Sequence, residues 1–157
     1  NRRSIDPAAL LERAGLAHMI EAERRGITLR VEAADDLPAV SVDTDRMAQV
    51  LNNLVSNALR HTPQGEVVLS ASAAGGKVLL SVRDSGSGIS EEDLPYVFER
   101  FYRGDKSRQR KGEESSGLGL AIAKAILEAH GGTIAVTSAP GHGATFVVTL
   151  AAKDEKS

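Results

Sequence analysis

The sequence predicts an α+β domain in which helices lie on one face of a mixed β-sheet. Three segments carry apolar residues at the helical period, and several short segments alternate apolar and polar residues as half-buried strands do. The two kinds of segment follow one another without the strict strand–helix alternation of a parallel α/β sheet. At 157 residues the chain is long enough for one hydrophobic core and short for two, so we expect a single domain.

The first part of the chain is expected to fold into two helices and two strands. Asp6 followed by Pro7 is typical of a helix start, because the carboxylate caps free amides and proline suits the first turn. Asp43 can cap a second helix, whose apolar residues from Met47 to Ala58 fall on one stripe. The expected elements are a helix over 6–26, strands over 27–33 and 40–42, and a helix over 43–61.

The second part is expected to add two strand pairs and a third helix. Gly75-Gly76 and Ala139-Pro140-Gly141 are turn sequences between alternating segments, which predicts antiparallel pairs. Residues 85–117 show little periodicity apart from one helical turn near 91–94, and a loop of that length is typical of a functional segment. The expected elements are strands over 67–72 and 78–83, a helix over 118–130, strands over 133–137 and 145–150, and a frayed tail over 152–157.

Composition narrows the classes of function. Basic and acidic residues are nearly balanced, 19 against 21, so no overall field favours nucleic acid or an anionic membrane. The chain has no cysteine, which excludes disulfides and thiolate metal sites and suits a reducing compartment. No apolar run approaches the ~20 residues of a spanning helix. The first residue is Asn1 within a helical-looking region, so we expect the chain to be part of a larger protein.

A polar stripe runs along the second helix beside the apolar one. Asn53 and Asn57 lie one turn apart on one face, with Gln49 a turn before and Arg60 and His61 a turn after. An amide oxygen can ligate a hard cation such as magnesium, and an arginine can meet a phosphate. Taken alone, the stripe is more typical of a solvated helix face with no functional role.

Three glycine-containing segments are candidates for ligand contact. The loop 84–89 follows a strand, and its glycines let the backbone approach a ligand while the Asp84 carboxylate can accept from an amine. Gly117 and Gly119 open a helix, where free amides and the helix dipole favour an anion. Residues 141–145 form a hairpin turn by default. Each segment alone is also compatible with an ordinary loop or hinge.

The common nucleotide-binding patterns are not met. A dinucleotide fingerprint would need a small residue where Ile122 stands, and a P-loop would need a glycine where Ala71 stands. The four histidines lack the spacing of metal ligands.

Taken in order, the segments resemble the catalytic domain of sensor histidine kinases, within the ATPase superfamily that includes DNA gyrase, the mismatch-repair protein MutL and a heat-shock chaperone. The resemblance covers about residues 6–150. The motifs that carry it are an asparagine box at 49–58, a first glycine box at 84–89, a phenylalanine box at 97–103, a second glycine box at 117–122 and a last box at 141–146.

The resemblance implies a two-layer α/β sandwich of the Bergerat type. In that fold a mixed, mainly antiparallel five-stranded sheet packs under three helices, and a mobile lid covers ATP. The single domain would occupy 1–157, with a core over about 6–151, the ATP lid over about 103–118 and the tail after it.

The resemblance also implies roles for individual residues. Asn57 would ligate the magnesium that bridges the phosphates, and Asn53 would line the same pocket as the second catalytic residue. Asp84 would accept from the adenine amine, with Thr145 supporting it through water. Phe98 and Phe101 would anchor the lid by packing. The other expected ATP-binding residues are Arg60, His61, Gly86, Gly88, Ile89, Arg103, Ser116, Gly117, Leu118, Gly119 and Leu120.

One position favours a kinase over a hydrolase. Members of the superfamily that hydrolyse ATP typically carry a glutamate one turn before the magnesium asparagine, and Asn53 stands there. An amide cannot take a proton, so water would be poorly activated and the γ-phosphate kept for another acceptor. The alternatives are a nucleotide-sensing module without transfer, a hydrolysing ATPase and a serine kinase of the same superfamily.

The partners implied are a phosphoacceptor histidine domain of the same parent, itself a homodimer, and a downstream response regulator. The parent would be a bacterial inner-membrane sensor with this domain in the cytoplasm. The chain departs from the family pattern where Arg60-His61 replaces lysine and an aromatic residue, and where residues 113–116 replace a more glycine-rich lid end. The acceptor histidine motif is absent, and His18 is expected to be structural.

Overall fold

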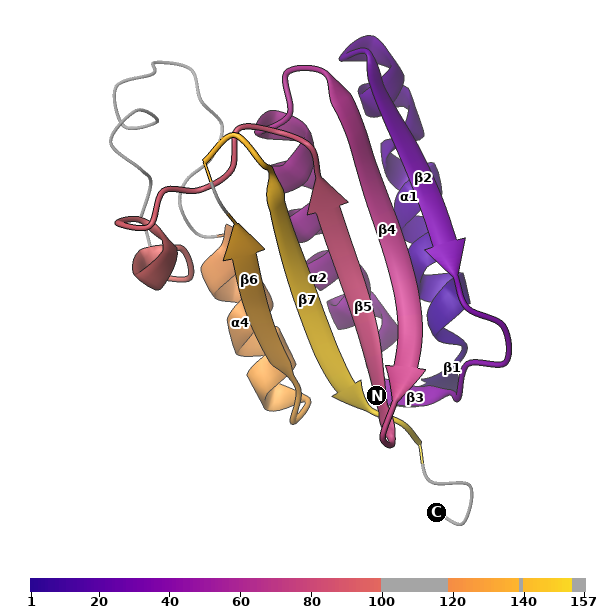
Figure 1. Ribbon diagram of the computed structural model, residues 1–157. Coiled ribbons are helices and arrows are strands. Elements are labelled where there is room, and N and C mark those ends of the chain that lie inside the picture. Colours follow the sequence, from indigo (N-terminus) through magenta and orange to yellow (C-terminus); the bar gives the residue numbers. More distant parts are fainter. Residues whose placement is uncertain (100–118, 139, 154–157) are drawn as a thin grey trace.

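In the part of the chain that the structure describes, three α-helices lie on one face of a five-stranded mixed sheet (Figure 1). The computed structural model describes residues 1–99, 119–138 and 140–153. The α+β class and the layering expected from the sequence are therefore confirmed. The expected lid over 103–118 lies outside the described residues.

The elements follow the predicted order closely. Periodicity locates each predicted helix and strand to within about three residues at its ends, which is the usual scatter of such boundaries. In chain order they are β1 Arg3–Ile5, α1 Pro7–Arg24, β2 Ile27–Ala33, β3 Val40–Val42, α2 Thr44–Arg60, β4 Gly65–Ala74, β5 Lys77–Asp84, the 3-10 helix η1 Leu94–Tyr96, α4 Gly119–Ala129, β6 Thr133–Ser138 and β7 Ala144–Ala151.

The main sheet has the strand order β2-β4-β5-β7-β6, in which only β2 and β4 run parallel. Its register aligns one row of three residues across β5, β7 and β6. Asp84 pairs with Ala144, and Ala144 pairs with Ser138. Since cross-strand partners share a face, these three side chains lie on the same side of the sheet. That side is the one covered by the helices, because Ala144 belongs to the buried core.

The second helix owes its position to its N-cap and its apolar stripe. The Asp43 carboxylate accepts from the amides of Asp45 and Arg46, both at 3.1 Å, and the Arg46 bond is the main reason that the pKa of Asp43 is lowered. The stripe buries Met47, Val50, Leu51, Leu54, Val55, Ala58 and Leu59 against the sheet and the neighbouring helices. None of the described helices is both long and apolar enough to span a membrane.

A second, two-stranded sheet holds the first residues of the chain, and separate backbone hydrogen bonds hold the last described ones. β1 pairs antiparallel with β3, and β1 was not predicted from the sequence. The amides of Ala152 and Lys153 donate to Gly76 (2.9 Å) and Ala39 (2.7 Å). Regular structure therefore begins at β1, before the expected start of the core at about residue 6. The prediction of a frayed tail over 152–157 is wrong for residues 152 and 153, because both are hydrogen-bonded to the domain. Residues 154–157 lie outside the described part.

His130 links the end of α4 to the start of α2, a role that its sequence spacing did not predict. Its Nδ1 donates to the carbonyl of Ile126 at 2.9 Å, and its Nε2 accepts from the amide of Asp43 at 3.1 Å. In this arrangement Nδ1 is the donor and Nε2 is the acceptor of the ring. His18 makes a local contact of 3.0 Å with the carbonyl of Ala14 in α1, as expected for a structural residue.

We expect His130→Ala to lower the free energy of unfolding by about 1–2 kcal/mol, because the Asp43 amide loses its acceptor. Urea denaturation at neutral pH would measure this. His142→Ala is the control, since that histidine is exposed in the β6–β7 connection. Equal stability of the His130 variant and the wild type would show that the link between α4 and α2 contributes nothing.

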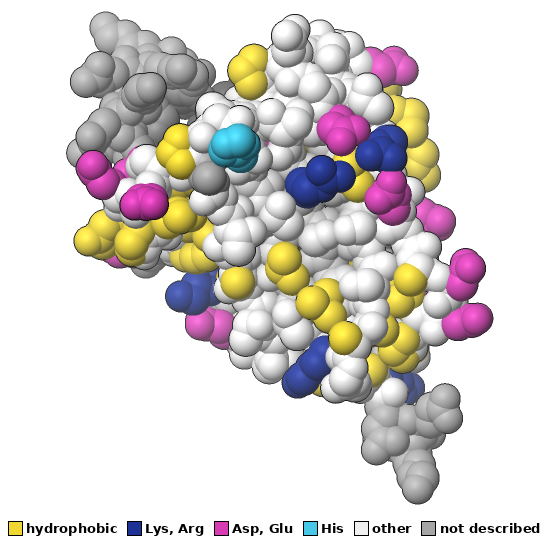
Figure 2. Space-filling view, viewed as in Figure 1, with side chains coloured by type: hydrophobic (Ala, Val, Ile, Leu, Met, Phe, Trp, Pro, Cys, Tyr) yellow, Lys and Arg dark blue, Asp and Glu magenta, His cyan; other side chains and the backbone are white. Residues whose placement is uncertain are grey.

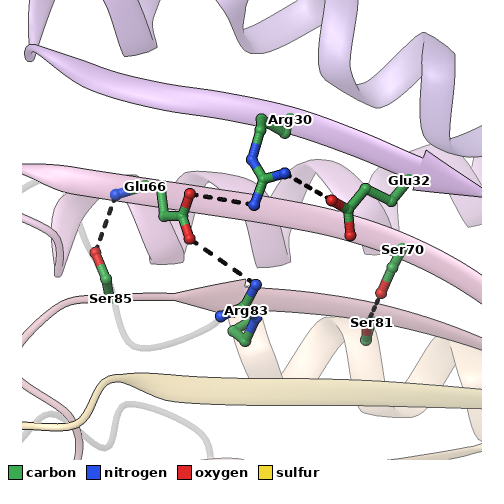
Figure 3. Close-up of polar contacts among 7 residues, drawn as sticks. All are labelled: Arg30, Glu32, Glu66, Ser70, Ser81, Arg83 and Ser85. Atoms are coloured by element: carbon green, nitrogen blue, oxygen red, sulfur yellow. Dashed lines mark hydrogen bonds and ion pairs between the residues drawn. The ribbon is translucent and has the colours of Figure 1, made fainter.

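The face of the sheet away from the helices carries polar side chains (Figure 2). Arg30 pairs with Glu32 at 2.6 Å and with Glu66 at 3.3 Å, and Glu66 lies 3.9 Å from Arg83 (Figure 3). The Ser70 and Ser81 hydroxyls bond to each other on the same face. All of the ion-pair partners are partly exposed, so each pair adds little stability. The network nevertheless crosses β2, β4 and β5 on the face of the sheet opposite to the buried row that ends in Asp84.

Candidate functional site

Asp84 is a buried carboxylate at the end of β5. Its side chain faces the helices, the residue is 4% exposed, and one carboxylate oxygen accepts from the Gly86 amide at 2.9 Å. Burial raises the pKa of Asp84, while backbone amides of Gly86 and Ala144 act in the opposite direction. A carboxylate that is withdrawn from water here can accept hydrogen bonds from a ligand at little further desolvation cost.

The two glycines of the loop after Asp84 are needed for different reasons. A Cβ on Gly86 would lie 2.0 Å from the carbonyl oxygen of His61, so the loop touches the end of α2 where only glycine fits. Gly88 has a φ of 78°, in the left-handed region that favours glycine. The sequence predicted close approach of this backbone to a ligand, whereas at Gly86 the close approach is to the protein itself.

We expect Gly86→Ala to displace the loop from α2 and to lower the free energy of unfolding by about 1–3 kcal/mol, as overpacking does. Nucleotide affinity should fall with it, because the loop holds the Asp84 carboxylate. Thermal melting and a nucleotide titration would measure the two effects. Ser87→Ala, at an exposed position of the same loop, is the matched control. A Gly86 variant that melts and binds as the wild type does would mean that the contact with His61 can relax freely.

Two asparagines of α2 face the region between the loop and α4. Asn57 is 8% exposed, and its side-chain amide makes no hydrogen bond to another described residue. The side-chain nitrogen of Asn53 donates to the carbonyl of Gly119, the first residue of α4, at 3.0 Å. Asn53 therefore fixes the start of α4, while the Asn57 amide is not engaged by another described residue.

The end of α2 connects this helix to the loop after β5. The His61 carbonyl accepts from the Ser87 amide at 3.4 Å, and the His61 amide donates back to Asn57 at 3.2 Å. Arg60 bonds the Ser56 hydroxyl at 3.2 Å. The C-terminal end of α2 and the end of β5 thus lie together at one end of the sheet (Figure 1). The loop after Asp84 therefore contacts His61, and His61 ends the helix that carries Asn57.

The structure does not bring Thr145 to Asp84. In the register, Thr145 is the partner of Arg83, and Asp84 is the partner of Ala144. Neighbouring residues of a strand point to opposite faces, so Thr145 lies on the open face with Arg83. The expectation that Thr145 supports Asp84 is therefore wrong, and the position beside Asp84 belongs to Ala144.

Three other residues that were expected near the site pack against the hydrophobic core. Leu120 and Ile89 are partly buried against it. The Phe98 ring packs edge-on against Phe146, with centroids 5.9 Å apart, and Lys124 lies 5.8 Å from its centroid. Phe98 thus has the packing role expected of it. The expectations for Phe101, Arg103, Ser116, Gly117 and Leu118 concern residues outside the described part.

The residues present fit a magnesium ion that is held mainly by its nucleotide. The described part of the chain has no group of three or more histidine, cysteine or acidic side chains that could hold a metal by itself. Magnesium usually takes one or two protein ligands and completes its octahedron with phosphate oxygens and water. The side-chain amide of Asn57, a residue that is 8% exposed, can supply one such oxygen ligand.

A hollow on the surface lies away from these residues. It is formed between α1 and β2, and no expected site residue borders it. Its lining residues are Glu12, Gly15, Leu16, Met19, Leu29 and Val31.

Residues 42–154 match the family described as histidine kinase-, DNA gyrase B- and HSP90-like ATPase. The chain is 40% identical to the sensor-like histidine kinase SenX3 of Mycobacterium tuberculosis over 97% of its own length and 37% of the relative's. It is 48% identical to the sensor histidine kinase CusS of Escherichia coli K12 over 83% of its length and 27% of the relative's. The chain therefore spans about a third of the length of these curated relatives.

Two solved structures share the fold. The catalytic domain of the histidine kinase ThkA, in a nucleotide-free form, matches all of this chain and 99% of that chain with a TM-score of 0.85 at 27% identity. Full-length ShkA in complex with AMPPNP matches 98% of this chain and 32% of that chain, with a TM-score of 0.86 at 31% identity.

Proposed function

The chain belongs to the family of histidine kinase-, DNA gyrase B- and HSP90-like ATPases, and we propose that it is the ATP-binding catalytic domain of a two-component sensor histidine kinase. In this function it binds magnesium-ATP and passes the γ-phosphoryl group to a histidine on a separate phosphoacceptor domain. The observation that supports the proposal most is the chain of contacts from Asp84 through Gly86 and His61 to the end of α2, the helix that carries Asn57.

Asp84 recognises the adenine end of the nucleotide. A purine with an exocyclic amine offers a donor, and a buried carboxylate is a strong acceptor for it. Because Asp84 is 4% exposed, water competes poorly for this bond. The loop that follows is held against α2, so the acceptor is fixed before the ligand arrives.

Asn57 and the start of α4 serve the phosphate end. Magnesium, when bound, neutralises charge on the phosphates during transfer. Asn57 would hold it through its amide oxygen, and the first amides of α4, beginning at Gly119, face outward from an 11-residue helix whose dipole favours an anion. The bond from Asn53 to Gly119 fixes the distance between these two groups.

Asn53 also favours transfer to a protein acceptor over hydrolysis. Its amide cannot act as a general base, and its nitrogen is already engaged with the Gly119 carbonyl. A water molecule beside the γ-phosphate would therefore lack a base in α2 at this position. Catalysis would rest on positioning and charge neutralisation, as phosphoryl transfer generally does.

The proposed partners follow from the function. They are the phosphoacceptor domain of the same parent, which would be a homodimer, and a response regulator that receives the phosphoryl group. We propose that the parent is a bacterial inner-membrane sensor and that this domain works on its cytoplasmic side.

A transfer assay tests the function. The chain would be mixed with labelled magnesium-ATP and a separately prepared phosphoacceptor domain, and the label on that domain would be tested for stability in acid. We expect acid-labile label on the acceptor and slow release of free phosphate. Nucleotide binding without transfer would favour a sensing module, fast phosphate release a hydrolase, and acid-stable label a serine kinase.

A further inference from the structure

We propose that Ser138 is a positioning residue for the adenine end of the site: its hydroxyl locks the loop after Asp84 to the β6–β7 connection. The effect of Ser138 on ATP binding rests on the proposed function. The link that Ser138 makes between the loop and the connection rests only on hydrogen bonds among described residues. No sequence motif drew attention to Ser138, which is the last residue of β6.

The Ser138 hydroxyl makes two hydrogen bonds at once. It accepts from the amide of Ile89 at 2.7 Å and donates to the carbonyl of Gly143 at 2.7 Å. Ile89 lies at the far end of the loop from Asp84, and Gly143 directly precedes β7. One side chain therefore joins the end of the loop to the connection between two strands.

Two backbone contacts hold the same surfaces together. The Gly141 amide donates to the Ser87 carbonyl at 2.7 Å. A Cβ on Gly143 would lie 2.0 Å from the carbonyl oxygen of Asp84, so the β6–β7 connection is in direct contact with the start of the loop. The loop is thus held by α2 on one side, through Gly86, and by the β6–β7 connection on the other.

The sheet places Ser138 where this bond can act on Asp84. Ser138, Ala144 and Asp84 form one row across three strands and share the helix-facing side. Two strand spacings separate the ends of the row, roughly 10 Å. The hydroxyl at one end of the row therefore fixes the loop that leaves the other end.

Only a side chain that both donates and accepts can make this link. Alanine would leave the Ile89 amide and the Gly143 carbonyl without their partner, whereas threonine keeps the hydroxyl and suits a strand. The effect expected in Ser138→Ala is a less ordered acceptor for adenine. The phosphate end, held by Asn57 and Gly119, should be unaffected.

The test combines binding with amide hydrogen exchange measured by NMR on the whole chain. In Ser138→Ala we expect the Ile89 amide to lose protection, and the affinities for adenosine and for an ATP analogue to fall by the same factor, roughly 3- to 10-fold. The transfer rate at saturating ATP should stay unchanged. Ser138→Thr should restore protection and affinity. Ser81→Ala, which removes a hydroxyl from the open face (Figure 3), is the control and should change neither.

Each result decides the inference. Ser138→Ala with wild-type affinity would overturn it, as would a wild-type Ile89 amide that exchanges like a solvent-exposed one. If the alanine variant does not fold, Ser138→Cys replaces it, and wild-type affinity in that weaker donor would also overturn the inference. A wild-type chain that binds neither adenosine nor the analogue would instead refute the proposed function, and amide protection would still decide whether Ser138 holds the loop.

Discussion

Asp84→Asn is expected to remove most of the nucleotide affinity without lowering the stability of the domain. The affinities for adenosine and for ATP should both fall by roughly 10- to 100-fold, the size of a lost hydrogen bond to a charged group. The free energy of unfolding should hold or rise, because the variant no longer buries a carboxylate that is 4% exposed. Fluorescence titration and urea denaturation on the same samples would measure both quantities.

The raised pKa of Asp84 also predicts how the free energy of unfolding should change with pH. Burial raises the folded-state pKa of Asp84 above the reference value of 3.8, so between the two values the folded state binds more protons than the unfolded state. The contribution of Asp84 to stability is therefore largest below pH 3.8 and is lost as the pH rises through the folded pKa. The stability difference between Asp84→Asn and the wild type should grow over that window and stay constant above it.

Asp35→Asn is the control for the loss of one charge, since Asp35 is exposed in the loop between β2 and β3. It should change neither affinity nor the pH profile. A variant of Asp84 that lost stability and affinity together would mean that the carboxylate serves mainly to hold its own loop through the Gly86 amide.

Asn57→Ala is expected to separate the two ends of the nucleotide. Affinity for magnesium-ATP should fall by roughly 10- to 100-fold, because the bound cation loses its ligand on α2. Affinity for adenosine should not change, since Asp84 and its loop are untouched. Phosphoryl transfer should be lost. Titrations with an ATP analogue, with and without magnesium, and with adenosine would measure the difference.

Asn52→Ala is the matched control for this change. Asn52 is a half-buried asparagine of the same helix, and a separation of five residues turns it away from the face of Asn57. It should leave binding with and without magnesium unchanged. Equal losses for adenosine and magnesium-ATP in Asn57→Ala would indicate that this asparagine shapes the whole site instead of its phosphate end.

Periodicity predicted most of the fold, because each helix and strand of the main sheet buries one face. The strand β1 was missed for the opposite reason. Three residues, Arg3–Ile5, carry no pattern of their own and form a strand only because β3 offers them a partner. The link from His130 to Asp43 is likewise a contact between distant residues, which spacing along the chain cannot indicate.

The motifs predicted which segments form the site but not which way every side chain points. The loop after Asp84 contacts the end of the helix that carries the two asparagines, and the roles of these three residues stay predictions. Thr145 was assigned by its place in a motif, whereas the pleat of β7 turns it to the other face and leaves Ala144 beside Asp84. Ser138 was missed because an isolated serine at a strand end is common, and its importance comes from the loop and the connection that it joins.

The anchoring of Phe98 on Phe146 and of Gly119 on Asn53 has a consequence for how such domains can diversify. Phe98 and Gly119 are described residues on either side of the sequence between them. Each of them contacts a residue of the sheet or of α2. Both contacts lie within the described body of the domain. A body that carries its own anchor contacts should keep them when the sequence between Phe98 and Gly119 is exchanged for that of a relative.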